Sequence, residues 1–369
     1  MENSINYEKE IEKLWNEYQV EKILPNIGLL GSTGSGKSSL INNIFGIDAA
    51  KVSDVKSKTQ DFQMYEGKKY GASVNLLDSK GYELTDVSTS FMERFKGYLA
   101  EKNSMHLVWV CISATKKRVE DIDLKIIGEL LQIQSLKERV FCVITKCDED
   151  DEEGSIAKNY KKILYESFPN LQIFEVSTHK DFPLELDNLL EESSKILDND
   201  DLRKSFIASQ IPNLELKRKE CEKILLIYSG LAGLVGAIPI SISDSKLIIP
   251  IQLKMLVEIA DIYNLDFNNT LLEGVVLKNV VTPLGKKISK FLKGKMVVVG
   301  SILDGVSAGA ITYGLGKGII ELMDIYSKKI LAGEKVDIIE LFNSNLIQDI
   351  IEKTINNFSS KKDKEKEEI

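Results

Sequence analysis

The sequence has few residues of the kinds that bind metals or form disulfides. It contains four cysteines, no two of which form a CxxC pair, and only two histidines, which disfavours a zinc site and a disulfide framework. It also lacks an excess of basic residues. The net charge is -8 and the isoelectric point about 5.2, which argues against a general nucleic-acid binder. We therefore expect reduced thiols, no DNA partner, and no RNA partner.

The N-terminal residues 1–20 are too highly charged to form a secretory signal. Ile11, Leu14, Trp15 and Tyr18 recur among these charges, which predicts a short amphipathic helix over residues 1–20. With unpaired cysteines as well, this segment favours a cytoplasmic protein.

Residues 23–180 alternate short apolar runs with helical patterns, and several runs end where a loop motif begins. This alternation is typical of an α/β domain with a mainly parallel sheet and helices on both faces. Ligands of such domains bind at the C-terminal ends of the strands. The runs that we expect to form strands are Asn26–Leu30, Ser73–Leu77, His106–Ser113, Val140–Thr145 and Gln172–Val176.

A glycine-rich loop that reads GSTGSGKS, a GxxxxGKS pattern, follows the first of these strands. Its glycines let the backbone wrap around a phosphate with amide hydrogens pointing inward, and the helix that follows adds its positive N-terminal end. Lys37 places a charge on the β- and γ-phosphates of a nucleoside triphosphate, and the Ser38 hydroxyl can ligate Mg²⁺. The residues predicted to bind nucleotide here are Gly31, Ser32, Thr33, Gly34, Ser35, Gly36, Lys37, Ser38 and Ser39.

A DxxG motif, Asp78 to Gly81, lies at the end of the next predicted strand. The Asp78 carboxylate can hold Mg²⁺ through water, and the Gly81 amide can contact the γ-phosphate. The pattern is weak by itself, but it becomes persuasive downstream of a phosphate-binding loop and at a strand end.

The sequence TKCD, Thr145 to Asp148, follows another predicted strand and selects the base. Asp148 can accept hydrogen bonds from N1–H and the 2-amino group of guanine, which adenine lacks. Lys146 is expected to lie along the base. Ser177 and Thr178 follow the last predicted strand, where a backbone amide can meet guanine O6, although STH departs from the usual Ser-Ala-Lys.

With these motifs, the chain resembles a P-loop GTPase of the Era- and TrmE-like branch over residues 21–200, most clearly in GLLGSTGSGKSSLINNIFG. The resemblance implies GTP or GDP with Mg²⁺ as ligands, and it makes Thr59 the switch-one threonine that closes on Mg²⁺. It places the metal on Ser38, Thr59 and Asp78. It also implies catalytic roles for Lys37, Thr59 and Gly81.

The residue after DxxG is Tyr82, where Ras-type enzymes place a glutamine that orients the attacking water. A tyrosine cannot orient water as an amide does. We therefore expect slow intrinsic hydrolysis that speeds up on self-association, with the water positioned by Gln60, a backbone group or a second protomer.

The C-terminal half contains two apolar, glycine-rich stretches, Ile224–Ile242 and Met296–Gly316, the second interrupted only by Asp304. The first is long enough to span a bilayer. Basic residues precede both stretches, and the positive-inside rule disfavours two single spans. A re-entrant hairpin and a buried helical core both remain open. Residues 284–295 pattern as a basic amphipathic helix, which either lies on an anionic membrane or packs on the protein's own core.

This half resembles the C-terminal apolar domain found on bacterial Era-like GTPases and, more distantly, the helical part of interferon-inducible immunity-related GTPases, through GLAGLVGAIPISISD and GVSAGAITYGLGKGII. We expect an all-α C-terminal domain. The predicted organisation is an N-terminal helix (1–20), a GTPase domain (21–200), a helical connector (201–222), the apolar helical domain (223–357) and a charged, disordered tail (358–369).

The whole sequence thus predicts a Mg²⁺-dependent GTPase that acts as a nucleotide switch controlling self-association, as a homodimer, or contact with a membrane surface. Two alternatives remain. One is a GTP-regulated binding module with negligible hydrolysis, and the other is an integral membrane protein with a cytosolic GTPase domain.

Overall fold

The computed structural model describes a large part of the chain: residue 17, residues 22–46, 62–67, 72–79, 88–101, 104–116, 119–151, 154–179, 184–236, 245–265 and 301–343, and residue 349. Several sequence-based predictions lie outside these residues, namely the N-terminal helix, Thr59, Gln60, Gly81, Tyr82, the basic segment 284–295 and the tail. The chain divides into two compact units. One comprises Ile23–Asn213, and the other comprises Met1–Lys22 together with Leu214–Ile369.

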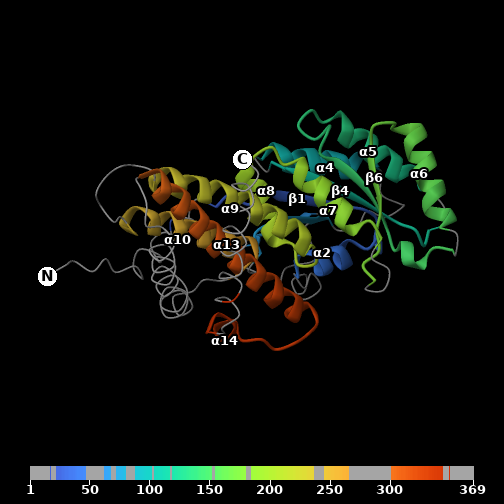
Figure 1. The fold of residues 1–369 in the computed structure, drawn as a ribbon. Coiled ribbons are helices and arrows are strands. Elements are labelled where there is room, and N and C mark those ends of the chain that lie inside the picture. The colour runs from blue at the N-terminus through green and yellow to red at the C-terminus, as the bar shows by residue number, and fades with distance from the viewer. Residues whose placement is uncertain are drawn as a thin grey trace, which may run out of the picture. The chain divides into compact units, whose positions relative to one another are not determined.

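The first unit contains a six-stranded sheet in the order β2-β3-β1-β4-β5-β6 (Figure 1). All neighbouring strands pair in parallel except β2, which runs antiparallel to β3 at the edge. The mainly parallel sheet expected from the sequence is confirmed, and β2 is an addition to it. The strands are β1 (Asn26–Leu30), β2 (Phe62–Tyr65), β3 (Asn75–Ser79), β4 (Leu107–Ser113), β5 (Val140–Thr145) and β6 (Gln172–Glu175).

Helices cover both faces of this sheet and bury two separate apolar cores. One core contains apolar residues of α2 (Lys37–Phe45), α7 (Leu186–Lys195) and α8 (Asp200–Ser209). The other contains those of α4 (Ser88–Ala100), α5 (Asp121–Gln132) and α6 (Ser155–Ser167). Because β4 and β5 are buried along their whole length, they lie at the centre of both cores.

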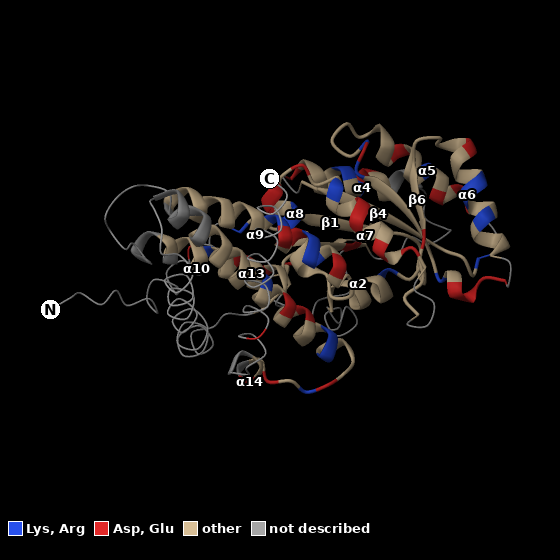
Figure 2. Cartoon of the chain, viewed as in Figure 1, with Lys and Arg blue, Asp and Glu red and all other residues tan. Residues whose placement is uncertain are grey.

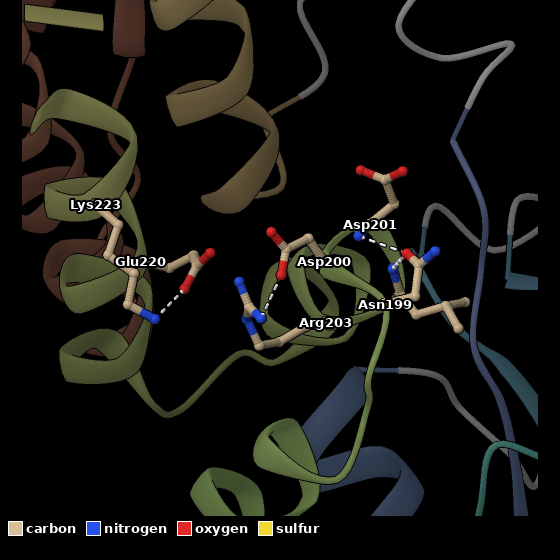
Figure 3. A network of polar contacts seen from close by, with 7 residues as sticks. Asn199, Asp200, Asp201, Arg203, Glu220 and Lys223 are labelled. Atoms are coloured by element: carbon tan, nitrogen blue, oxygen red, sulfur yellow. Dashed lines mark hydrogen bonds and ion pairs between the residues drawn. The ribbon is translucent and has the colours of Figure 1, made fainter. Parts of the chain in front are cut away.

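Helix α8 begins at an N-cap that the sequence makes recognisable (Figure 3). The Asn199 side chain accepts hydrogen bonds from the amides of Asp201 and Leu202 at 2.8 and 3.1 Å, which satisfies two N–H groups that the helix leaves unpaired. Arg203 pairs with Asp200 one turn away at 2.6 Å. The first unit extends through α8 to Asn213, so residues 201–213 belong to it.

The described part of the second unit consists of α9 (Leu214–Gly236), α10 (Ser245–Ile262), α13 (Ser301–Leu331) and α14 (Ile338–Asn343). Glycines bring α9 and α13 close together: a Cβ atom built at Gly309 would meet the carbonyl oxygen of Ser229 at 3.0 Å and the Cα of Gly233 at 3.5 Å. Along the described helices, acidic and basic residues are interspersed (Figure 2). Among the residues that the structure describes, no helix is long and apolar enough to cross a bilayer.

Ionisable side chains of this helical unit are paired with one another, and several of them are buried. Lys22 donates to Asp261 of α10 at 2.6 Å, and Arg218 of α9 contacts Asp324 of α13 at 2.7 Å. The Tyr263 hydroxyl donates to the same Asp324 carboxylate. Helix α13 continues from the predicted apolar stretch well past Gly316, to Leu331. The charged residues Lys317 and Asp324 in this extension pair with residues of α9.

Candidate functional site

The predicted phosphate-binding loop connects β1 to α2 and depends on glycine geometry. Gly34 and Gly36 have φ angles of 78° and 85°, and Gly36 is the N-cap of α2, a conformation that favours glycine. A Cβ atom at Gly31 would stand 2.4 Å from the Cys111 carbonyl oxygen. The loop is therefore fixed close to the end of β4. The loop follows β1, which lies between β3 and β4 in the sheet, and neither neighbour is the next strand in the sequence. Open α/β sheets bind ligands at such a change in strand order.

Lys37 folds back over this loop. Its ammonium donates to the carbonyl oxygens of Gly31 at 2.8 Å and Ser32 at 3.1 Å. Burial lowers the pKa of Lys37, and electrostatic interactions with Cys111 and Asp78 oppose that effect. A lysine held this way presents a positive charge at the loop, where a phosphate can attract it.

Two buried oxygens beside the loop have no hydrogen-bond partner in the described structure: Ser35 Oγ and Asp78 Oδ1. Burial raises the pKa of Asp78 to about 6, although Lys37 counteracts it. A buried, unsatisfied carboxylate oxygen is costly unless a ligand satisfies it. Its chemistry fits Mg²⁺, which prefers oxygen ligands. Ser38, exposed in the first turn of α2, is the other described residue predicted to hold the metal.

At the opposite end of the site, Asp148 stands in a short 3-10 helix, Cys147–Glu149, directly after β5. The Ser177 hydroxyl donates to the Asp148 carboxylate at 2.8 Å, and the His179 amide donates to the same hydroxyl at 3.0 Å. Lys146 has a φ of 57°, which turns the chain sharply between Thr145 and Asp148. The carboxylate is exposed and oriented, as recognition of a base requires.

The structure places the remaining predicted residues around these two ends. Thr145 is buried, and its hydroxyl donates to the Ser35 carbonyl at 2.7 Å, which links the phosphate loop to the TKCD segment. The Thr178 carbonyl accepts a hydrogen bond from Asn43 of α2 at 3.3 Å. Thr33, Gly34, Ser38 and Ser39 are solvent-accessible in the loop and the first turn of α2.

Sequence reasoning missed two residues of this site. Lys116, in the loop after β4, donates to the Ser32 hydroxyl at 2.7 Å. Asn43 connects α2 to the Ser177–Thr178 segment. The sequence assigned a role to neither side chain, since both reach the site through the fold. The one available signal was the position of Lys116 just beyond a predicted strand end.

The sheet order, the glycine-rich loop after β1 and the family match given next identify the first unit as a P-loop GTPase domain, followed by a helical region. Residues 26–146 match the family model described as 50S ribosome-binding GTPase. The P-loop GTPase domain expected from the motifs is confirmed, and its place in the Era- and TrmE-like branch stays a prediction. The resemblance of the C-terminal half to immunity-related GTPases stays a prediction.

Curated relatives of this chain include bacterial GTPases. GTPase Der of Chloroherpeton thalassium is 30% identical over 141 residues, which are 38% of this chain and 31% of that protein. GTPase Der of Borreliella burgdorferi is 28% identical over 184 residues, covering 48% and 41%. A solved structure of a variant of Era from Aquifex aeolicus, bound to GDP and AlF4⁻, is 22% identical with a TM-score of 0.34 and covers 48% of this chain and 57% of that one. The chain thus spans less than half the length of the two Der proteins.

Proposed function

We propose that this protein binds GTP and GDP together with Mg²⁺ and hydrolyses GTP to GDP and phosphate. The observation that carries the proposal is that the site has a phosphate-binding end and a base-binding end, which a hydrogen bond connects. Lys37 and the unsatisfied Asp78 oxygen lie at the phosphate loop, and Asp148 is oriented by Ser177 at the base end. The Thr145 hydroxyl connects the two through the Ser35 carbonyl.

Each residue has a separate task in this proposal. The loop amides and Lys37 hold the β- and γ-phosphates, and Asp148 pairs with guanine. Ser38 and Asp78 hold Mg²⁺, which neutralises charge that develops on the phosphates. Thr59 and Gly81, outside the described residues, complete the metal and γ-phosphate contacts in the same proposal.

Replacing Asp148 with Asn tests the base assignment. The amide loses an acceptor for the guanine 2-amino group, so GTP affinity should fall by about tenfold or more while xanthosine triphosphate affinity rises. Titrations with both nucleotides measure the change. Glu149→Gln is the matched control, because Glu149 is the exposed neighbour in the same 3-10 helix. Unchanged GTP affinity in Asp148→Asn removes the assignment.

We further propose that the nucleotide state controls self-association or contact with a membrane surface. Apolar side chains on α9 support this, because Leu226, Ile227, Leu231 and Leu234 are between 44% and 71% exposed, and an exposed apolar patch is typical of an interaction surface. Sedimentation with GDP and with a non-hydrolysable GTP analogue, each with and without anionic liposomes, measures both kinds of contact. Identical sedimentation in all four conditions argues against either.

The rate of hydrolysis distinguishes a switch enzyme from a binding module. Tyr82 stands where a glutamine orients water in Ras-type enzymes, so we expect slow turnover that rises with protein concentration. A single-turnover assay over a wide concentration range measures it. Constant, near-zero turnover favours the binding module. Resistance to carbonate extraction from membranes would instead favour the integral membrane protein.

A further inference from the structure

Lys116 occupies a fixed place beside the phosphate loop although it belongs to no nucleotide-binding motif. It follows β4, and its amide donates to the Ser113 carbonyl at 3.2 Å. The Tyr160 hydroxyl of α6 donates to the Lys116 carbonyl. With its backbone held on both sides, Lys116 extends its side chain to the Ser32 hydroxyl at 2.7 Å.

Two lysines therefore meet at one residue of the loop. Lys37 donates to the Ser32 carbonyl at 3.1 Å, while Lys116 donates to the Ser32 side chain. Two ammonium groups at one buried residue repel each other, and the charge of Lys116 is among the causes that lower the pKa of Lys37. Asp78 is the carboxylate that counteracts this lowering, and its own oxygen Oδ1 is unsatisfied. Such an excess of positive charge suits a ligand that carries several negative charges.

We propose that Lys116 is a second phosphate-binding lysine that contacts the terminal phosphate of the bound triphosphate. The proposal rests on the function proposed above. Lys116 and Lys37 both contact Ser32. The lysine of a phosphate-binding loop, here Lys37, pairs with the β- and γ-phosphates. The base end of the site lies beyond β5, where Asp148 stands. The flexible four-carbon stem of Lys116 lets its ammonium leave the neutral Ser32 hydroxyl for a phosphate oxygen, because hydrogen bonds between ionised groups are stronger.

Comparing triphosphate with diphosphate binding tests this contact. In Lys116→Gln, loss of one charge-assisted hydrogen bond should weaken a non-hydrolysable GTP analogue by about tenfold to a hundredfold. GDP, which lacks the terminal phosphate, should lose about threefold or less. Lys116→Met serves as a second neutral variant, and Lys116→Arg should retain most of the affinity. Lys125→Gln, an exposed lysine of α5, removes the same charge elsewhere and should change neither affinity.

Ser32→Ala separates contact with the nucleotide from support of the loop. If Lys116 only holds the loop through the Ser32 hydroxyl, Ser32→Ala should weaken the GTP analogue as much as Lys116→Gln does. If Lys116 contacts the phosphate, Ser32→Ala should keep the preference for triphosphate. Equal losses for GDP and the analogue in Lys116→Gln, or no loss, would overturn the proposal. A wild-type protein that binds neither nucleotide would instead refute the proposed function itself.

Discussion

Lys217 in α9 provides a direct test of how the helical unit accommodates charge. It is 3% exposed, and burial lowers its pKa from 10.5 to about 7. Cys221 and Asp261 oppose this lowering, and Lys22 adds to it. We replace Lys217 with Met, which keeps the length of the aliphatic stem and removes the ammonium group.

The expected effect depends on pH in a defined direction. Because the pKa of Lys217 is lower in the folded chain, the unfolded chain binds more protons between the two pKa values, and stability rises with pH in that window. For pKa values of 10.5 and about 7, the wild type should gain about 2 kcal/mol between about pH 7 and pH 9. The Met variant should lack this gain, so its stability advantage over the wild type should shrink by about the same amount.

Urea unfolding at several pH values tests this prediction. Hydrogen exchange of peptides from α9 and α13 reports the helical unit apart from the GTPase domain. Lys219→Met is the matched control, because Lys219 lies on the same helix, has a side chain 52% exposed, and pairs with Glu215. A difference between wild type and Lys217→Met that stays constant from about pH 7 to pH 9 would refute the reasoning, since Lys217 would then be charged in the folded protein.

Two further predictions concern the Asp78 carboxylate and the crossing of α9 and α13. Burial raises the pKa of Asp78 from 3.8 to about 6, so ionisation of Asp78 destabilises the metal-free fold as the pH rises between these values. In urea titrations, the wild type should lose about 1 kcal/mol of stability relative to Asp78→Asn between about pH 5 and pH 7.5. If the difference between the two proteins does not change with pH, the Asp78 carboxylate is not buried. Gly309→Ala forces a methyl group against α9 and should cost about 1–3 kcal/mol. Gly230→Ala meets no atom within 4 Å and should stabilise α9 by about 0.5–1 kcal/mol. Thermal unfolding measures both glycine variants, and equal effects would contradict the close approach of α9 and α13.

The GTPase domain could be predicted from sequence because its signals are local. The phosphate loop and Asp148 follow β1 and β5, and Asp78 lies at the C-terminal end of β3. A parallel sheet brings such strand ends together without further information. Strand β2 was missed for the opposite reason. Phe62–Tyr65 is four residues long, and its pairing with β3 is decided across the sheet edge, which no pattern within the strand specifies.

The helical unit was harder to predict because its charges are satisfied over long distances in sequence. Lys317 and Asp324 mark the end of an apolar stretch in the sequence, yet both lie within α13. Lys317 contacts Glu222 at 2.7 Å and Asp324 contacts Arg218 at 2.7 Å, both across to α9. A short segment of sequence shows that burying such charges is costly, but it does not show the distant residues that pair with them.

The GTPase domain is an insertion within the helical unit, and Lys22 pairs with Asp261 of that unit just before the insertion begins. The chain leaves that unit after Lys22 and returns to it at Leu214. Asp261 interacts electrostatically with Lys217, three residues beyond the return point, and forms an ion pair with Lys22 at the departure point. A fragment that begins at Leu214 therefore leaves Asp261 without the Lys22 partner. A permuted or excised version that joins Lys22 to Leu214 through a short linker keeps both, and it is the form in which the helical unit can be studied alone.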